Sequence, residues 1–108
     1  MAAQTIVVLF NLRPGTARDR YEAWARTTDL PLVRGLESIG RFSVYRAVAT
    51  MGGAASPYAY IEVIEVRNVA RFGEELAGPL MQRVAAEFQA FADNPAFIIV
   101  EPLEPMVA

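Results

Sequence analysis

The sequence predicts an α+β fold of ferredoxin-like layout, with the element order β-α-β-β-α-β and a four-stranded antiparallel sheet that carries both helical regions on one face. Two observations lead to this prediction. Four segments are apolar and rich in β-branched or aromatic residues, which is typical of strands. Between them lie two longer segments in which apolar residues recur at helical spacing. The length of 108 residues fits a single domain over residues 1–108.

The first strand and the first helix are expected near the N-terminus. Residues 5–12 are apolar and β-branched, and a turn containing Pro14 and Gly15 ends them. Thr16 is expected to cap a helix that reaches Thr28. The inward stripe of this helix is expected to consist of Ala17, Tyr21, Trp24, Ala25 and Thr28.

The middle of the chain predicts a hairpin. Pro31 interrupts the helical pattern, so a short helical turn is expected over residues 31–36. Two strands are expected over residues 40–50 and 58–66. The loop between them, residues 51–57, consists mostly of small residues.

The second helical region is expected to begin at Asn68, a good N-cap. Gly78 and Pro79 interrupt it, so a kink or two abutting helices are expected there. Residues 93–95 are expected to end the helix before a last strand over residues 96–101, after which the tail leaves the fold. The apolar stripe of this region consists of Phe72, Leu76, Leu80, Val84, Phe88 and Phe91.

The strands are apolar on both faces of the predicted sheet. Residues 6–10 and 97–100 are apolar at every position, whereas a sheet with one solvated face should alternate apolar and polar residues. The helices can cover only one face. We therefore expect a two-fold homodimer in which the other faces meet. The alternative is that the C-terminal tail and the loops cover this face.

Composition excludes several classes of partner. The formal net charge is -2, and the basic residues are spread along the chain, so no nucleic-acid partner is expected. No apolar stretch approaches the ~20 residues of a membrane span. The N-terminus also lacks the pattern of a signal peptide. These features predict a cytoplasmic protein with no membrane partner.

The absence of three residue types limits the chemistry. The chain has no Cys and no His, and all ten of its basic residues are Arg. Thiolate, imidazole and lysine chemistry are thereby excluded, and no metal site and no cofactor are expected. Proton transfer is left to Asp, Glu and Tyr side chains, or to the substrate itself.

Glu62 and Asp29 are the candidate catalytic residues. Glu62 is flanked by apolar residues and lies on the opposite strand face from Glu65. A desolvated carboxyl has a raised pKa and can serve as a general acid or base near neutrality. The alternative for Glu62 is a cross-strand ion pair with Arg46. Asp29 lies at the end of the first helix, and its alternative role is a helix cap.

The gap between sheet and helices is the expected place for a ligand. Aromatic side chains facing this gap would suit a flat aromatic molecule, and an arginine or a tyrosine hydroxyl could orient its polar group. The alternative is that the aromatic stripes are plain core. The residues expected to bind substrate are Tyr21, Trp24, Arg46, Tyr58, Tyr60, Met81 and Phe88.

Several motifs together resemble one protein family. They are the stretch from Asp29-Leu-Pro to Arg46, the preceding residues 21–28, the strand segments 8–15 and 60–66, and the helical segments 81–88 and 91–95. In these motifs, which cover nearly the whole chain, the sequence resembles the REDY-like, HapK family of dimeric α+β barrel proteins. The resemblance implies a homodimer with a small-molecule pocket in each protomer. Members of that family occur in gene clusters for pyrrole- and indole-derived pigments such as prodigiosin.

The chain departs from wider relatives of that family at one position. The EthD-like relatives carry a His where this chain has Asp29, in a similar pattern before a leucine-rich turn. Their mechanisms therefore do not transfer directly, but an Asp in the same place could perform the proton transfer.

Three functional hypotheses remain open from the sequence. The first is a cofactor-independent enzyme that cyclises, tautomerises or oxygenates a hydrophobic aromatic or heteroaromatic intermediate of pigment or other secondary-metabolite biosynthesis. The second is a non-catalytic accessory protein that shields an intermediate or assists a partner enzyme. The third is a ligand-sensing domain, which would need a partner chain because no DNA-binding segment is present.

Overall fold

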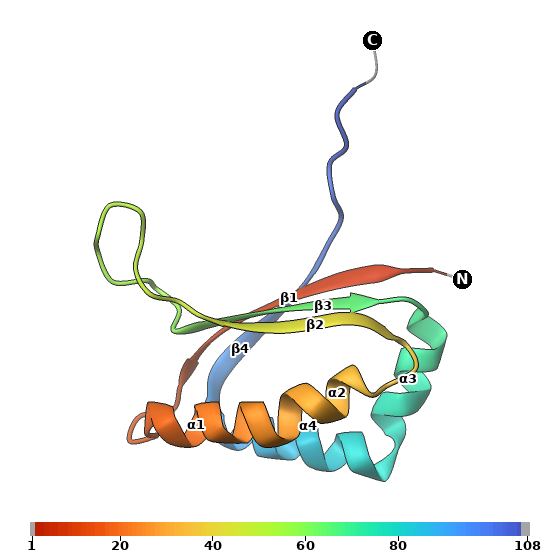
Figure 1. Ribbon diagram of the computed structural model, residues 1–108, viewed down its shortest axis with the longest axis horizontal. Helices are drawn as coiled ribbons and strands as arrows, with labels where there is room; N and C mark the ends of the chain where they lie inside the picture. Colours follow the sequence, from red (N-terminus) through yellow and green to blue (C-terminus); the bar gives the residue numbers. More distant parts are fainter. Residues whose placement is uncertain (1, 107–108) are drawn as a thin grey trace.

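A computed structural model describes residues 2–106 and contains one antiparallel sheet (Figure 1). The strands are β1 (Gln4–Leu12), β2 (Ile39–Arg46), β3 (Tyr60–Val66) and β4 (Ala92–Val100). Their order across the sheet is β2-β3-β1-β4, and every neighbouring pair is antiparallel. This is the order of a ferredoxin-like sheet, so the predicted fold class is confirmed.

The helices all lie on one face of this sheet (Figure 1). They are α1 (Arg18–Trp24), the π-helical segment η1 (Ala25–Asp29), α2 (Leu30–Arg34), α3 (Val69–Ala77) and α4 (Pro79–Phe91). The break predicted at Gly78 and Pro79 separates α3 from α4. Gly78 is extended there, with ψ 158°, and the proline begins the next helix, where its missing N–H costs nothing.

The cap predictions had mixed outcomes. Asn68 caps α3 as expected, because its side chain accepts a hydrogen bond from the backbone N–H of Arg71 at 3.1 Å. The prediction for Thr16 was wrong, because the N-cap of α1 is Ala17 and no side-chain bond caps that helix. The peptide N–H of Thr16 instead bonds to the carbonyl of Arg13 and closes the preceding turn.

The loop between β2 and β3 is longer than predicted. It spans residues 47–59, because β2 ends at Arg46 and β3 begins at Tyr60. Pro57 has no N–H to donate to a strand ladder. The side chain of Asn11 holds the base of this loop, accepting from the N–H of Ala59 at 2.9 Å and donating to the carbonyl of Pro57 at 3.1 Å.

Residues 93–95 follow the end of α4, as predicted, but they belong to β4, which was expected to begin only at residue 96. The strand begins at Ala92, directly after α4, and includes Pro95. Asn94 has a positive φ of 46°, and the pairing of β1 with β4 shifts register between Leu9 and Asn11. The strand therefore continues through a β-bulge at which Asn94 is left-handed. Pro95 is tolerated because β4 is an edge strand.

The two faces of the sheet differ in what covers them. Val8, Phe10, Tyr60 and Val66 face the helices and are buried. The side chains that alternate with them form what we call the open sheet face, which no helix covers (Figure 1). Its apolar members include Val7, Leu9, Tyr45, Ile61, Val63 and Ile98.

The C-terminal tail does not cover the open sheet face. Residues 101–106 run away from the sheet (Figure 1), and Leu103 and Met106 are 97% and 98% exposed. Most of the loop 47–59 is exposed as well. The alternative that tail and loops bury this face is therefore wrong for the single chain.

No helix within residues 2–106 is both long and apolar enough to cross a membrane.

Candidate active site

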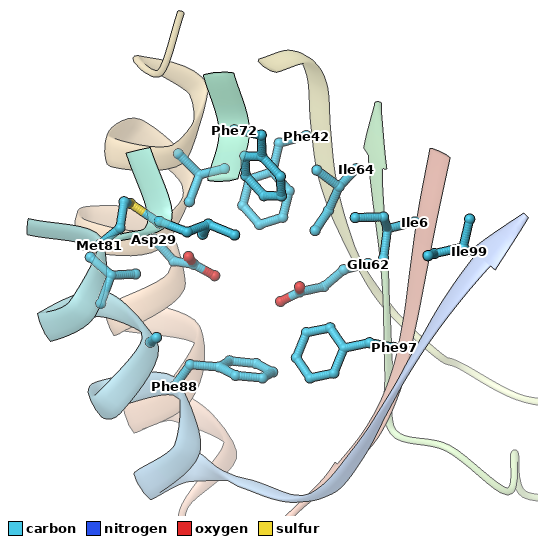
Figure 2. Close-up of a pocket in the computed structure, with 14 residues that line it drawn as sticks. Ile6, Asp29, Phe42, Glu62, Ile64, Phe72, Met81, Phe88, Phe97 and Ile99 are labelled. Atoms are coloured by element: carbon cyan, nitrogen blue, oxygen red, sulfur yellow. The ribbon is translucent and has the colours of Figure 1, made fainter. Parts of the chain in front are cut away.

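An apolar cavity with a volume of about 320 Å³ lies between the sheet and the helices (Figure 2). Of its 14 lining residues, only Asp29 and Glu62 are polar. Leu76, Phe97 and Ile99 are 37%, 55% and 64% exposed, so they form its rim. The lining residues are Ile6, Phe42, Glu62, Ile64, Phe97 and Ile99 from the sheet, and Asp29, Val33, Phe72, Leu76, Met81, Val84, Ala85 and Phe88 from the helices.

Asp29 reaches the cavity from the end of η1. Its backbone is helical, with φ -63° and ψ -55°, and η1 continues directly into α2 without a side-chain cap bond. The helix-cap alternative for Asp29 was therefore wrong. A π-helical turn inserts one extra residue and re-aims the side chains that follow, and such turns occur often at functional sites. Asp29 is only 5% exposed, and burial raises its pKa to about 7.

Glu62 reaches the cavity from the centre of β3. It is 4% exposed, and its Oε2 atom is buried without a hydrogen-bond partner among the described residues. Burial, and secondarily the nearby charge of Asp29, raises the pKa of Glu62 to about 8. As predicted, Glu65 lies on the other face of the strand and is exposed.

The ion pair considered between Glu62 and Arg46 does not form. The hairpin register places Arg46 opposite Tyr60 and places Val44 opposite Glu62. Arg46 instead donates to the carboxylate of Glu22 on α1, with an Nε–Oε2 distance of 2.7 Å. Glu62 therefore lacks the cation that would have kept it ionised.

The two carboxyl groups point toward one another across the cavity (Figure 2). Two carboxylates in an apolar surrounding disfavour each other's ionisation, so near neutral pH the pair retains at least one proton. Such a pair can donate a proton and accept one in the same cavity. This is the arrangement that general acid–base catalysis needs.

A separate polar cluster lies at the other end of the sheet. Glu22 accepts hydrogen bonds from Arg46 and from the hydroxyl of Tyr60, the latter at 2.7 Å. The hydrogen bond from Arg46 lowers the pKa of Glu22 to about 2. A small cavity of about 80 Å³ lies beside these groups and is also lined by Tyr21. Sequence reasoning missed Glu22, although its place directly after Tyr21 put it beside the inward stripe of the helix.

The structure separates the predicted substrate-binding residues. Met81 and Phe88 line the main cavity. Tyr21 is fully buried and packs against Tyr60 with a ring-centroid distance of 4.7 Å. Trp24 donates from Nε1 to Glu87 at 2.8 Å. The predicted residues outside the main cavity are Tyr21, Trp24, Arg46, Tyr58 and Tyr60.

Sequence reasoning named Phe88 but missed the other aromatic rings at the cavity walls, Phe42, Phe72 and Phe97. Phe97 and Phe88 approach each other edge to face, with centroids 6.2 Å apart. Phe42 and Phe72 line the wall nearer to β2 and α3 (Figure 2). Because residues 97–100 are apolar at every position, their pattern could not show which of them face the helices.

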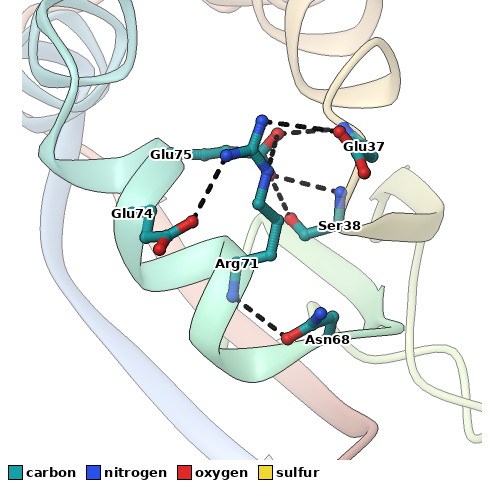
Figure 3. Close-up of polar contacts among 6 residues, drawn as sticks. All are labelled: Glu37, Ser38, Asn68, Arg71, Glu74 and Glu75. Atoms are coloured by element: carbon teal, nitrogen blue, oxygen red, sulfur yellow. Dashed lines mark hydrogen bonds and ion pairs between the residues drawn. The ribbon is translucent and has the colours of Figure 1, made fainter. Parts of the chain in front are cut away.

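One wall of the cavity is α3, which a polar cluster anchors to the segment before β2 (Figure 3). The carboxylate of Glu75 accepts from the N–H of Glu37 at 3.0 Å, and from the N–H and the hydroxyl of the buried Ser38. Arg71 contacts Glu74 and Glu37 at 3.2 and 3.4 Å. Burial alone would raise the pKa of Glu75, but the hydrogen bonds from Ser38 and Glu37 hold it below its usual value.

Replacing Glu75 by alanine is expected to lower the free energy of unfolding by about 2 kcal/mol, because Ser38 would lose its charged acceptor. Urea denaturation of the purified variant measures this change. Glu74→Ala is the matched control, since Glu74 is exposed and pairs only with Arg71 in the described part of the chain. Equal effects of the two substitutions would contradict the anchoring role of Glu75.

Within residues 2–106, no three His, Cys, Asp or Glu side chains are grouped as metal ligands.

Comparisons place the chain in a family. The family model for the REDY-like protein HapK matches residues 4–103. The chain belongs to the REDY-like HapK family. The crystal structure of HapK from Hahella chejuensis superimposes with a TM-score of 0.74 at 26% sequence identity, covering 97% of both chains. No curated protein matches the chain.

More distant structures share the fold. SnoaB, a cofactor-independent oxygenase from Streptomyces nogalater, has a TM-score of 0.72 at 16% identity, with 98% of both chains covered. A dimeric protein of unknown function with a ferredoxin-like fold, from Bacteroides fragilis, has a TM-score of 0.66 at 13% identity, covering 92% of this chain and 95% of its own. At these identities the likeness shows the fold.

Proposed function

We propose that this HapK-family protein is a cofactor-independent enzyme that transfers protons on a hydrophobic aromatic or heteroaromatic substrate. The observation that carries the proposal is the pair of facing carboxyl groups, Asp29 and Glu62, in an otherwise apolar cavity. The resemblance to proteins of pigment gene clusters supports a substrate from pigment or other secondary-metabolite biosynthesis.

The simplest reaction is a tautomerisation. The carboxyl group that is ionised accepts a proton from a C–H of the substrate, and this C–H bond breaks as an O–H bond forms. The carboxyl group that is protonated donates its proton to another substrate atom. Electrons and atoms balance, and the pair returns to its starting charge with its proton on the other carboxyl. A cyclisation needs the same two transfers.

The cavity suits such a step because its lining is apolar apart from the two carboxyl groups. Its rings and aliphatic side chains bind a flat molecule, and its low polarity keeps the pKa values of Asp29 and Glu62 near 7 and 8. Oxygenation, the third reaction considered, would require dioxygen as a second substrate. The fold that the chain shares with a cofactor-independent oxygenase supports oxygenation as an alternative reaction.

We also propose that two copies assemble through their open sheet faces. The apolar side chains of this face lie on all four strands, and Tyr45 and Ile98 are 55% and 43% exposed in the single chain. Exposed apolar surfaces of this kind usually mark interfaces. The ferredoxin-like protein from Bacteroides fragilis is described as dimeric, which supports the assembly of two copies.

A second candidate function is that of a non-catalytic carrier that shields an intermediate. The observation in its favour is that 12 of the 14 lining residues are apolar, which leaves few groups for chemistry. A carrier would bind its ligand saturably and return it unchanged on long incubation.

Replacing Asp29 by asparagine, or Glu62 by glutamine, is expected to slow proton transfer by roughly 100-fold or more, because each change removes one acid–base group. Native mass spectrometry of the gently purified protein first identifies a bound small molecule. Incorporation of deuterium from heavy water into that molecule then measures the transfer. Glu65→Gln, on the other face of the same strand, is the matched control. Wild-type rates in both variants would sink the catalytic assignment and favour the carrier.

A further inference from the structure

We propose that the natural ligand of the cavity is a hydrophobic molecule that carries a protonated nitrogen, and that this cation lies between Asp29 and Glu62. The inference rests on the proposed function, because it names the substrate class of that same site. The inference concerns the charge of the ligand, because the proposed proton transfer does not require the substrate to be charged.

The cavity offers a ligand acceptors and lacks a fixed cation. The two carboxyl groups are the only polar side chains of the lining, and no arginine is part of it. Arg46 is occupied by Glu22 outside the cavity, and Arg34 donates to the carbonyl of Phe42 at 3.0 Å. The carboxyl oxygen atoms that carry no proton only accept hydrogen bonds, so a ligand has to supply the donors for them.

Glu62 shows that a donor is missing. Its Oε2 atom is buried and has no hydrogen-bond partner among the described residues. Buried acceptors in native proteins are nearly always satisfied, and each exception calls for an explanation such as a ligand. An N–H group bound in the cavity would satisfy this atom, and Asp29 on the facing wall could accept a second N–H from the same nitrogen.

The charges around the pair also favour a cation. The charge of Asp29 adds to the effect of burial in raising the pKa of Glu62, and burial raises the pKa of Asp29. Tyr21 of α1 also lies near the pair, and its uncharged hydroxyl is buried without a hydrogen-bond partner in the described part of the chain. The remaining elements, β1, β2, α2, α3, α4 and β4, contribute only apolar side chains to the lining. A cation would offset the repulsion between two carboxylates, whereas an anionic ligand would add to it.

The walls set the size and shape of the apolar part. A volume of about 320 Å³ is at the small end of ligand pockets and fits one or two fused rings. Phe88 and Phe97, whose rings lie 6.2 Å apart, flank the space beside the carboxyl pair (Figure 2). Their faces can attract both a flat ring and an adjacent cation.

Three indole probes of similar shape test the inference. Tryptamine carries an ammonium group, 3-ethylindole carries no charge, and indole-3-propionate carries a carboxylate. Titration calorimetry at about pH 7 is expected to show tryptamine binding at least tenfold more tightly than 3-ethylindole, with indole-3-propionate weakest. Binding of tryptamine should release protons, measured by comparing buffers of different ionisation enthalpy, and its affinity should rise between about pH 6 and pH 8.

Variants separate the carboxyl pair from the rest of the cavity. Glu62→Gln and Asp29→Asn are each expected to abolish the preference for tryptamine over 3-ethylindole, while Glu65→Gln keeps it. The uncharged probe reports whether each variant retains a folded cavity. Equal or tighter binding of 3-ethylindole by the wild type overturns the cation inference but leaves the small-molecule site of the proposed function intact. Failure of all three probes to bind overturns the inference and removes the support for the site itself.

Discussion

Replacing Glu62 by leucine is expected to raise the free energy of unfolding at about pH 9 by on the order of 3 kcal/mol, because it removes a buried carboxylate whose Oε2 atom has no hydrogen-bond partner among the described residues. Most substitutions in a core destabilise the fold. This one is expected to stabilise it, since leucine fits an apolar lining and needs no proton. Chemical denaturation of the wild type and the variant at matched pH measures the difference.

The pH dependence of stability follows from the same carboxyl groups. The pKa of Glu62 is raised from 4.5 to about 8 in the folded protein, so the folded state holds more protons than the unfolded state within that interval. Stability should therefore fall as pH rises through this window, by at most about 1.4 kcal/mol per pH unit for each group. Asp29 adds the same trend between pH 3.8 and about 7.

Variants should separate the contributions of Glu62 and Asp29 to the pH dependence of stability. Glu62→Leu should flatten the fall in stability toward alkaline pH and leave the part that Asp29 contributes at lower pH. Glu65→Leu, which changes an exposed carboxylate on the same strand, should keep the wild-type slope. A wild-type stability that is constant between about pH 5 and pH 9 would show that Glu62 is solvated or paired in solution.

The sequence predicted the face of Glu62 but not its neighbours. Strand alternation correctly put Glu62 with Tyr60 and Ile64 and put Glu65 on the other face, because side chains alternate with a period of two. The partner across the hairpin depends on where the loop is centred. The predicted ion pair with Arg46 required the loop to be centred one residue later than it is. With the observed register, Val44 lies opposite Glu62 in place of Arg46.

Asp29 was harder to place. Asp29 lies two residues before Pro31, which is the pattern of a helix end. An aspartate in such a position often caps the helix that follows, so a cap was expected. The chain instead passes through a π-helical turn, which local propensity does not indicate. Only packing of η1 and α2 against the sheet shows that the side chain of Asp29 turns into the cavity toward Glu62.

The apolar character of both sheet faces connects the fold with the site. β4 contributes Phe97 and Ile99 to the rim of the cavity and Ile98 to the open sheet face. β3 contributes Glu62 to the cavity and Ile61 to the open sheet face in the same way. A partner packed on the open sheet face would therefore stiffen the strands that hold the cavity residues.

Replacing Ile61 by aspartate is expected to convert a dimer into monomers. Ile61 lies on a central strand, between Leu9 of β1 and Tyr45 of β2, so two-fold packing of the open sheet faces would bury it. The substitution buries one unpaired carboxylate from each copy, and each costs about 3–5 kcal/mol, so the dimer Kd should rise by roughly a thousandfold or more. Native mass spectrometry and analytical ultracentrifugation over a concentration series measure it.

The control for this change is Leu80→Asp, which places the same charge on an exposed apolar residue of α4, on the helix side of the molecule. This variant should keep the assembly mass of the wild type. Circular dichroism should show that Ile61→Asp remains folded. Residue 61 is only partly buried in the single chain, so water can solvate an aspartate side chain there. A wild-type protein that is monomeric at micromolar concentration, or an Ile61→Asp variant that stays dimeric, would contradict the two-fold packing. In either case the exposed apolar side chains of the open sheet face would need another partner to cover them.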